Sequence, residues 1–381
     1  MSVQRAFLAI LVGGLVLTLV TDSRAQVDSR RIEEVIKKDV LTQADMEIID
    51  AFVSDAVGRL VRTTDFTEVA KTRAAIVSRQ ISQAQYAQRF SDAVHREIGK
   101  GFGYATDEIL DPARRFKVFT NLLILAGELN DPQLVDLGLG LIGHENSTVR
   151  YWALRVATNP GVWDKISQDQ STAGPLARKI IDASRPVVPT SSPEVLHLMA
   201  QFAGRYDTTP TQDLLLDIAD VRIQSYADWT VRYELVDTGI LKLLSARLAA
   251  GGTAGQPLAL RFCQLYSYAI QRYIRGLRDN RLRGLSTTHL ASVLLETEQQ
   301  CLGKLLGGPQ AGIQRAVETG DLNALQAEHD RLLGSANQPG VLSARFSVTY
   351  GSAQDKRSAP LALPDPPQPG ATTAAPAPAQ P

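Results

Sequence analysis

Arginines dominate residues 261–284, and their spacing suits ligand binding better than any other residues of the chain. This stretch holds six arginines and a single acid, Asp279. Guanidinium groups at three-residue steps fall close to one helix face and can bind a phosphate, a sulfated or teichoic polymer, or anionic lipid headgroups. The cluster can equally be a solvated face, or pair with the acidic run Asp213, Asp217 and Asp220 on a neighbouring helix. The candidate binding residues are Arg272, Arg275, Arg278, Arg281 and Arg283.

The two cysteines, Cys263 and Cys301, lie on two predicted helices, residues 256–279 and 287–306. Each is 19 residues from Leu282, near the centre of the turn between these helices, so an antiparallel hairpin would bring them to the same height. An oxidising exported compartment then favours a disulfide. The alternative is two buried thiols.

Two acid–histidine pairs could contribute to a metal site. Asp92 and His95, and likewise Glu194 and His197, lie one helical turn apart. Two such pairs are half of the di-iron pattern of ferritin-like bundles, but the spacing supports no further pair of glutamates. We therefore predict no metal ion and no other cofactor. The histidines without an acid or second histidine at three or four residues are His144, His289 and His329.

Gly138, Gly140 and Gly143 have the spacing of a dinucleotide-binding loop. That loop requires a buried strand before the glycines and a helix that starts on them. Here Asp131 and Pro132 instead start a helix with an apolar face. We interpret the stretch as a helix–turn–helix unit whose glycines allow a neighbouring helix to approach closely. Metalloprotease and nucleophile-elbow motifs are also absent from the sequence, which lowers the odds of an enzyme.

The elements that must position these residues are predicted to be helices. From about Val27 to Leu333 apolar residues recur at three- and four-residue steps, the helical period, giving roughly a dozen helices. "DP" at 111–112 and 131–132 places proline in the first helical position, where its missing N–H is harmless. The predicted N-cap residues are Asp65, Ser82, Asp107, Asp131 and Ser147.

A short sequence echo indicates a repeat. "TVRYWAL" at 148–154 returns as "TVRYEL" at 230–235, 82 residues later, with Asp131 and Asp213 at the same offset. Half of that offset falls within the roughly 40–47 residues of a two-helix repeat. Three consecutive units thus resemble HEAT or armadillo repeats. The resemblance implies a helical solenoid with an exposed partner-binding face and no catalytic residues; the alternative is an irregular helical domain with a chance echo. The three units are 131–158, 174–205 and 211–249.

The C-terminal part departs from the helical pattern. Residues 342–350 alternate apolar and polar side chains, which predicts a half-buried strand. It could pair with another chain and so form an oligomer, or lie as an extended segment on the helical body. Residues 358–381 contain 8 of the 19 prolines and 7 alanines, a composition that predicts a disordered tail.

The N-terminus predicts export. Arg5 precedes an uncharged apolar run from Ala6 to Val20, and Ser23 and Ala25 are the small residues that signal peptidase prefers. The run is short for a bilayer that needs about 20 apolar residues, so we predict cleavage after Ala25 and no transmembrane insertion afterwards. A retained membrane anchor is the alternative.

Composition sets the remaining limits. The 381 residues carry 40 basic and 40 acidic side chains, a balance that argues against nucleic acid as partner. The predicted fold is all-α, either HEAT-like or an irregular α-solenoid, with one short extended segment. The predicted domains are a signal peptide (1–25), an N-terminal helical region (26–130), HEAT-like helix pairs (131–250), a helical hairpin region (251–335), an extended segment (336–357) and the tail (358–381).

These observations predict a non-catalytic exported scaffold or adaptor, periplasmic or extracellular and associated with a bacterial envelope. Its expected partner is another envelope protein or an anionic polymer. The alternative is an exported helical enzyme that acts on a polymer through carboxylates in a concave groove. Such an enzyme needs a deep pocket with at least two acids of perturbed pKa, whereas a scaffold needs a broad and shallow surface.

Overall fold

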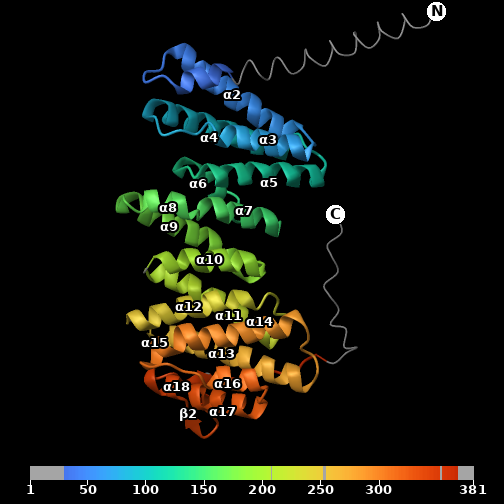
Figure 1. The fold of residues 1–381 in the computed structure, drawn as a ribbon, viewed down its shortest axis with the longest axis vertical. Coiled ribbons are helices and arrows are strands. Elements are labelled where there is room, and N and C mark those ends of the chain that lie inside the picture. The colour runs from blue at the N-terminus through green and yellow to red at the C-terminus, as the bar shows by residue number, and fades with distance from the viewer. Residues whose placement is uncertain (1–29, 207, 252–254, 352–353, 368–381) are drawn as a thin grey trace, which may run out of the picture. The chain divides into compact units, whose positions relative to one another are not determined.

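The computed structural model describes residues 30–206, 208–251, 255–351 and 354–367 (Figure 1). Over these ranges the chain is all-α, which confirms the predicted fold class, and the strands are four segments of two residues each. The chain divides into two compact units, residues 1–176 and 177–381. The division falls within α9 (Gln170–Ser184), so each unit is described separately.

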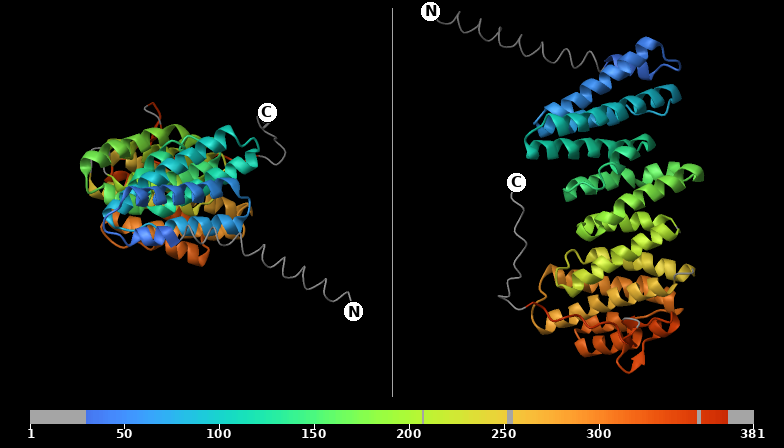
Figure 2. Two further views of the ribbon diagram at one scale, coloured as in Figure 1. Left: turned by 90° about the horizontal axis from the view of Figure 1, so that it is seen from above. Right: turned by 180° about the vertical axis from the view of Figure 1, so that it is seen from behind.

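The first unit is a stack of helices around one continuous hydrophobic core. Helix α2 packs on α4, α4 on α5, and α5 on α7, and these helices lie side by side in Figure 1 and in the right-hand view of Figure 2. Its core includes Ile49, Phe90 and Leu122. The elements are α2 (Gln43–Arg62), α3 (Phe66–Val77), α4 (Ala84–Asp107), α5 (Pro112–Leu129), η1 (Pro132–Leu134), α6 (Val135–Leu139), α7 (Ser147–Ala157) and α8 (Pro160–Ile166).

Side-chain caps define where these helices begin. Asp65 and Asp131 cap α3 and η1 through their carboxylates, as predicted. The other three predicted caps are wrong by one to four residues: Gln83 caps α4 in place of Ser82, Asp111 caps α5 in place of Asp107, and Asn146 caps α7 in place of Ser147. Pro112 and Pro132 occupy first-turn positions, where no amide hydrogen is needed.

The glycine-rich stretch is a helix contact, as predicted. Helix α6 packs on α7, and a Cβ added to Gly138 would lie 2.6 Å from the carbonyl oxygen of Ala153 and 2.9 Å from the amide nitrogen of Ala157. Only glycine therefore fits at this crossing without displacing backbone. Gly140 ends α6.

The second unit is organised around α13 (Gly255–Arg278), which contacts α11, α12, α14, α17 and α18. Its aromatic and aliphatic side chains are buried on most sides, including Phe262, Tyr266 and Ile270. The other elements are η2 (Arg185–Thr190), α10 (Pro193–Arg205), α11 (Thr209–Ala227), α12 (Leu235–Ala250), α14 (Leu285–Thr297), the π-helical turn η3 (Glu298–Leu302), α15 (Gly303–Leu306), α16 (Gly312–Thr319), α17 (Leu322–Leu333), β1 (Gly334–Ser335), β2 (Gln338–Pro339), α18 (Val341–Arg345), β3 (Tyr350–Gly351) and β4 (Lys356–Arg357).

The sequence echo does not mark equivalent positions. Residues 148–154 lie inside α7, whereas residues 230–234 form the turn between α11 and α12. Likewise Asp131 caps η1, but Asp213 lies inside α11. Helix pairs do occupy the three predicted units, so the helical part of the prediction holds and its supporting echo does not.

The predicted strand at 342–350 is wrong. Residues 341–345 form the short helix α18, and Ser347 then takes a left-handed conformation (φ 53°) that reverses the chain. A lone strand would have left its backbone groups without partners, and the short helix pairs them internally. Leu342 and Tyr350 are fully buried. The remaining pairing is local, between β1 and β2 and between β3 and β4.

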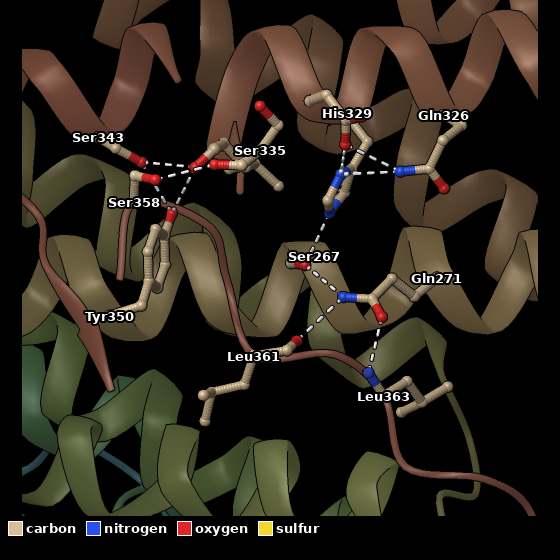
Figure 3. Close-up of polar contacts among 12 residues, drawn as sticks. Ser267, Gln271, Gln326, His329, Ser335, Ser343, Tyr350, Ser358, Leu361 and Leu363 are labelled. Atoms are coloured by element: carbon tan, nitrogen blue, oxygen red, sulfur yellow. Dashed lines mark hydrogen bonds and ion pairs between the residues drawn. The ribbon is translucent and has the colours of Figure 1, made fainter. Parts of the chain in front are cut away.

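Residues 358–367, named here the C-terminal strap, lie along α13 rather than free of the body (Figure 3). The prediction of a disordered tail is therefore wrong for this part, because side chains of α13 bind backbone groups that a proline-rich segment cannot pair by itself. The remainder of the predicted tail, and the predicted signal peptide, lie outside the described residues.

Across the part of the chain that the structure describes, no helix combines the length and the apolar character needed to span a bilayer.

Candidate functional site

Two glutamines on one face of α13 bind the backbone of the strap. The amide of Gln264 donates to the Leu361 carbonyl (3.2 Å) and accepts from the Leu361 N–H (2.9 Å). The amide of Gln271 donates to the same carbonyl (3.1 Å) and accepts from the Leu363 N–H (2.7 Å). Gln264 and Gln271 are seven residues apart, which is two helical turns, so both point at the strap (Figure 3 shows Gln271). An amide that donates and accepts at once recognises an extended backbone whatever its side chains are.

An arginine and a tryptophan continue this row toward the end of α13. Arg275 donates to the carbonyls of Leu363 (2.7 Å) and Pro364 (3.0 Å), and its guanidinium lies 3.4 Å from the Asp365 carboxylate. The indole N–H of Trp229 donates to the Pro364 carbonyl (2.9 Å). We call Trp229, Gln264, Gln271 and Arg275 the strap-binding face.

Arg272 supports the strap-binding face through its contact with Trp229. Its guanidinium lies over the Trp229 ring, 4.9 Å from the ring centroid, as in a cation–π contact. Its Nε and one terminal nitrogen are buried without a hydrogen-bond partner among the described residues. Burial lowers the pKa of Arg272, and the nearby Tyr226 and Glu234 oppose that effect. The stacked arginine fixes the tryptophan ring that binds Pro364.

A buried ion pair holds the turn that presents Trp229. Arg222 donates to both carboxylate oxygens of Asp237 (2.6 and 2.9 Å), with both side chains almost fully buried, and Tyr226 donates to the same carboxylate (2.8 Å). Arg222 also donates to the Arg232 carbonyl, inside the turn between α11 and α12. The backbone of Trp229 is in the left-handed conformation (φ 58°), which costs a non-glycine residue about 1–3 kcal/mol. The ion pair stabilises this strained turn.

A second polar chain connects the strap-binding face to α17. Ser267 lies 2.8 Å from His329 Nε2 (Figure 3). On the other side of the ring, His329 Nδ1 lies 2.9 Å from Asp330. Gln271 donates to Ser267 (2.8 Å) as well as to the strap. Burial lowers the pKa of His329, against the opposing effect of Asp330, so the imidazole stays neutral and can accept from the serine hydroxyl.

This chain has the residue order of a hydrolytic triad, but its surroundings differ from those of one. Ser267 is completely buried in the middle of α13, and it accepts a hydrogen bond from Gln271. Backbone N–H groups inside a helix are already bonded within it, so none is free to bind an oxyanion. The contacts orient Gln271 and join α13 to α17.

The strap is also fixed where it enters. Ser358 donates to the carbonyls of Ser335 (2.9 Å) and Ala336 (3.3 Å). A Cβ on Gly334 would lie 2.2 Å from the Ser358 carbonyl oxygen, so this close approach needs glycine. Nearby, Ser343 and Tyr350 both donate to the Leu333 carbonyl (Figure 3).

The energy balance of the strap is nearly even. Seven hydrogen bonds between described residues join it to the strap-binding face, each worth about 1 kcal/mol net. Leu363 is almost fully buried, which adds about 2 kcal/mol. Ordering the backbone of residues 360–365 costs about 1–2 kcal/mol for each residue. The two sides agree within a few kcal/mol, so the strap is held weakly.

The predicted arginine cluster separates into two groups. Arg275 belongs to the strap-binding face, and Arg272 supports it through Trp229. Arg278 donates to Asn323 (3.3 Å), Arg283 donates to the carbonyl and side chain of Asn280, and Arg281 is exposed. The alternative of pairing with the acidic run holds in part, because Asp220 pairs with Arg261 (2.9 Å), the first of the six arginines. The other two acids pair with Arg185 outside this stretch, Asp217 at 2.8 Å and Asp213 at 3.9 Å.

The predicted disulfide is not present. Cys263 and Cys301 are both buried free thiols, the alternative that the sequence left open. They face different neighbours: Cys263 hydrogen-bonds with Tyr350, and Cys301 with Ser245. Cys301 lies in η3, which has π-helical geometry. The two cysteines are equally far from the hairpin centre in sequence, but the π-helical turn changes the direction in which Cys301 points. Burial raises the pKa of Cys263 to about 12.

Carboxylates with shifted pKa values do not gather in one place. Asp45, Glu97, Asp169 and Asp355 all have lowered pKa values. Hydrogen bonds from Lys38 and Thr42 lower the pKa of Asp45 to about 2. A general acid needs a raised pKa, so none of these four fits that role.

The acid–histidine pairs do not meet either. His95 contacts Asp136 (3.0 Å) rather than Asp92, and His197 contacts Gln201 (2.9 Å). Within the described ranges, no group of three metal-ligating side chains is close enough to hold an ion.

A cavity of about 590 Å³ lies in the first unit, beside the start of α4 and the α5–η1 turn. Its charged side chains are already engaged, because Asp131 accepts from Ser91 and Lys165 donates to the Asn130 carbonyl. The cavity therefore offers mainly neutral amide and hydroxyl groups.

Comparison with known proteins gives no relative: no protein-family model, curated protein or solved structure matches the chain.

Proposed function

We propose that this chain is an exported, non-catalytic helical scaffold that binds another protein through the strap-binding face. One observation carries the proposal: Gln264, Gln271 and Arg275 bind the backbone of one extended segment, at Leu361, Leu363 and Pro364. Hydrogen bonds to main-chain groups give affinity for an extended peptide, and pockets for its side chains give specificity. Export rests on the apolar run and small residues that end at Ala25.

The partner class is protein rather than anionic polymer. Binding a polyanion needs cationic groups that are free. At the strap-binding face, Arg275 is engaged by two carbonyls and Asp365, and Arg272 is stacked on Trp229. The exposed arginines of the cluster, Arg278, Arg281 and Arg283, lie outside the strap-binding face. Exposed apolar side chains lie at the turn between α11 and α12, which carries Trp229: Tyr233 is 60% exposed and Leu235 is 44% exposed. Such side chains add contact area for a protein.

The HEAT-like organisation is part of the proposal. The helix pairs α9–α10 and α11–α12 fall on two of the three units that the sequence suggests, and α10 packs on both α11 and α12. In a helical repeat, the surface built by successive pairs binds the partner.

A photoreactive residue at Tyr233 tests the proposal in cells that express the chain. We expect a cross-linked adduct with one dominant envelope protein. The adduct should be lost when Gln271→Ala and Arg275→Ala are combined. The same photoreactive residue at Phe66, which is 69% exposed and lies in the other unit, is the matched control and should not give that adduct. A chain that forms no Tyr233-specific protein adduct would contradict the scaffold.

The Ser267–His329–Asp330 chain raises an enzyme candidate other than the carboxylate enzyme considered from the sequence, a serine hydrolase. A fluorophosphonate probe, which modifies activated serines, tests it directly. Labelling that is abolished by Ser267→Ala would support a hydrolase and contradict the non-catalytic proposal. We expect no labelling, because Ser267 has no exposed surface.

A further inference from the structure

The strap occupies the strap-binding face as an internal ligand, and its chemistry describes the partner. We propose that the face exchanges the strap for a proline-flanked, leucine-containing extended segment of a partner protein, with an acid after the second proline. This inference rests on the proposed function and names the ligand class of that site.

The contacts favour exchange over permanent closure. Each hydrogen bond from Gln264, Gln271 and Trp229 goes to a backbone group of the strap, so any chain in the same conformation can form it. Proline at the first, fifth and last two positions of residues 360–367 restricts that conformation before binding, which reduces the entropy lost.

Two side chains of the strap supply selectivity. Leu363 is 1% exposed and contributes most, whereas the Asp365 carboxylate is 95% exposed at 3.4 Å from Arg275 and adds only a weak preference. In contrast, Leu361 remains 38% exposed although its backbone is bound on both sides. A competing segment therefore needs proline, then leucine three residues later and then proline, with a weak preference for an acid after it, and it is free at the position of Leu361.

Because the strap competes for the strap-binding face, it lowers the apparent affinity of that face for a peptide added in solution. A short flexible tether gives an effective concentration on the order of 1 mM. If the strap segment binds with a dissociation constant of about 0.1 mM, this effective concentration leaves the face free in about one molecule in ten. Releasing the strap should then tighten peptide binding about tenfold.

The experiment measures binding of a fluorescent peptide of residues 358–367 (SAPLALPDPP) to the full chain by anisotropy. Leu363→Asp should release the strap while leaving the face intact, so we expect about tenfold tighter binding than to the unaltered chain. Leu361→Asp is the matched control, because that side chain is exposed, and it should change binding little. Adding Arg275→Ala to Leu363→Asp should abolish binding. Circular dichroism and the urea midpoint confirm that each variant is folded.

The outcomes separate the two proposals. Peptide binding that is equal in the unaltered chain and Leu363→Asp, yet lost with Arg275→Ala, would keep the binding face and overturn the exchange. Absence of peptide binding to every variant would overturn the proposed function itself. If the unaltered chain forms a dimer that Leu363→Asp abolishes, the occupant is the strap of a second copy, and the partner-segment inference is wrong.

Discussion

Replacing Gln271 by alanine should loosen the strap in a way that hydrogen exchange can measure. Gln271 makes two bonds to the strap, to the Leu361 carbonyl and from the Leu363 N–H. At about 1 kcal/mol net for each bond, their loss lowers the free energy of strap opening by about 2 kcal/mol. Since 1.4 kcal/mol is a factor of ten, the opening equilibrium of the strap should shift about 30-fold toward the open state. That shift removes almost all of the roughly tenfold amide protection of a strap that is open in about one molecule in ten.

The amide of Leu361 is the informative reporter. Its acceptor is Gln264, which the substitution leaves in place, whereas Leu363 loses its own acceptor directly. Faster exchange at Leu361 therefore reports opening of the whole strap rather than loss of one contact. Four residues of 360–367 are prolines without an amide hydrogen, so few signals overlap.

Two further variants make the measurement specific. Gln256→Ala removes another glutamine of α13, which donates to the Ser347 carbonyl outside the strap, and it should leave Leu361 exchange unchanged. Gln271→Glu keeps an acceptor for the Leu363 N–H but removes the donor to Leu361, and it should give an intermediate rate. If Leu361 exchanges at the same rate in Gln271→Ala and the unaltered chain, the strap is not held by this face and our reasoning fails.

Three other substitutions probe the supporting structure. Asp237→Asn leaves the Arg222 guanidinium buried without its counter-charge, so the unfolding free energy should fall by about 3–5 kcal/mol in urea titrations; a loss below 1 kcal/mol would contradict this. His329 has a lowered pKa in the folded state, so stability should fall as the pH drops below the unfolded value of about 6.5, and His329→Gln should flatten that decline between pH 7 and 5. Gly138→Ala should lower the unfolding free energy by about 1–3 kcal/mol because its Cβ meets backbone atoms, whereas Gly99→Ala, where the space is open, should be neutral or stabilising; equal effects would refute the close-packing argument.

Helical periodicity predicted the architecture because burial of one helix face leaves a signal in every turn. Met46, Ile49, Val53, Val57 and Leu60 follow that period and fall on α2. The short echo at residues 148 and 230 carried no such constraint. Six similar letters can form a helix in one place and a turn in another, because packing partners decide which.

The strand at 342–350 failed for a related reason. Alternation over nine residues is compatible with a strand, but it is also compatible with one short helix followed by a turn. Leu342, Ser343, Val348 and Tyr350 are all buried, and they reach the core from α18 and from the chain beyond it. A strand needs a partner strand, and the sequence contained no good candidate for one.

The candidate site could be found only in part. Arg272 and Arg275 were identified from their charge and spacing, whereas Gln264 and Gln271 were missed because neutral amides form no charge pattern. The available signal was their seven-residue spacing, which places two polar amides on the same face of a largely apolar helix. Composition also concealed the strap, since a segment rich in proline and alanine reads as disordered unless its receptor is known.

Arg275 shows how an arginine cluster can bind a peptide backbone. A guanidinium recognises oxygen in fork geometry, and backbone carbonyls offer that oxygen as readily as a phosphate does. Arg275 binds the Leu363 and Pro364 carbonyls, and the Asp365 carboxylate lies close enough to balance its positive charge in part. The glutamines beside it both donate and accept, which matches the N–H and C=O groups that an extended polypeptide presents in alternation. An arginine cluster by itself is therefore compatible with any anion, but Arg275 beside two glutamines also fits an extended backbone such as the strap.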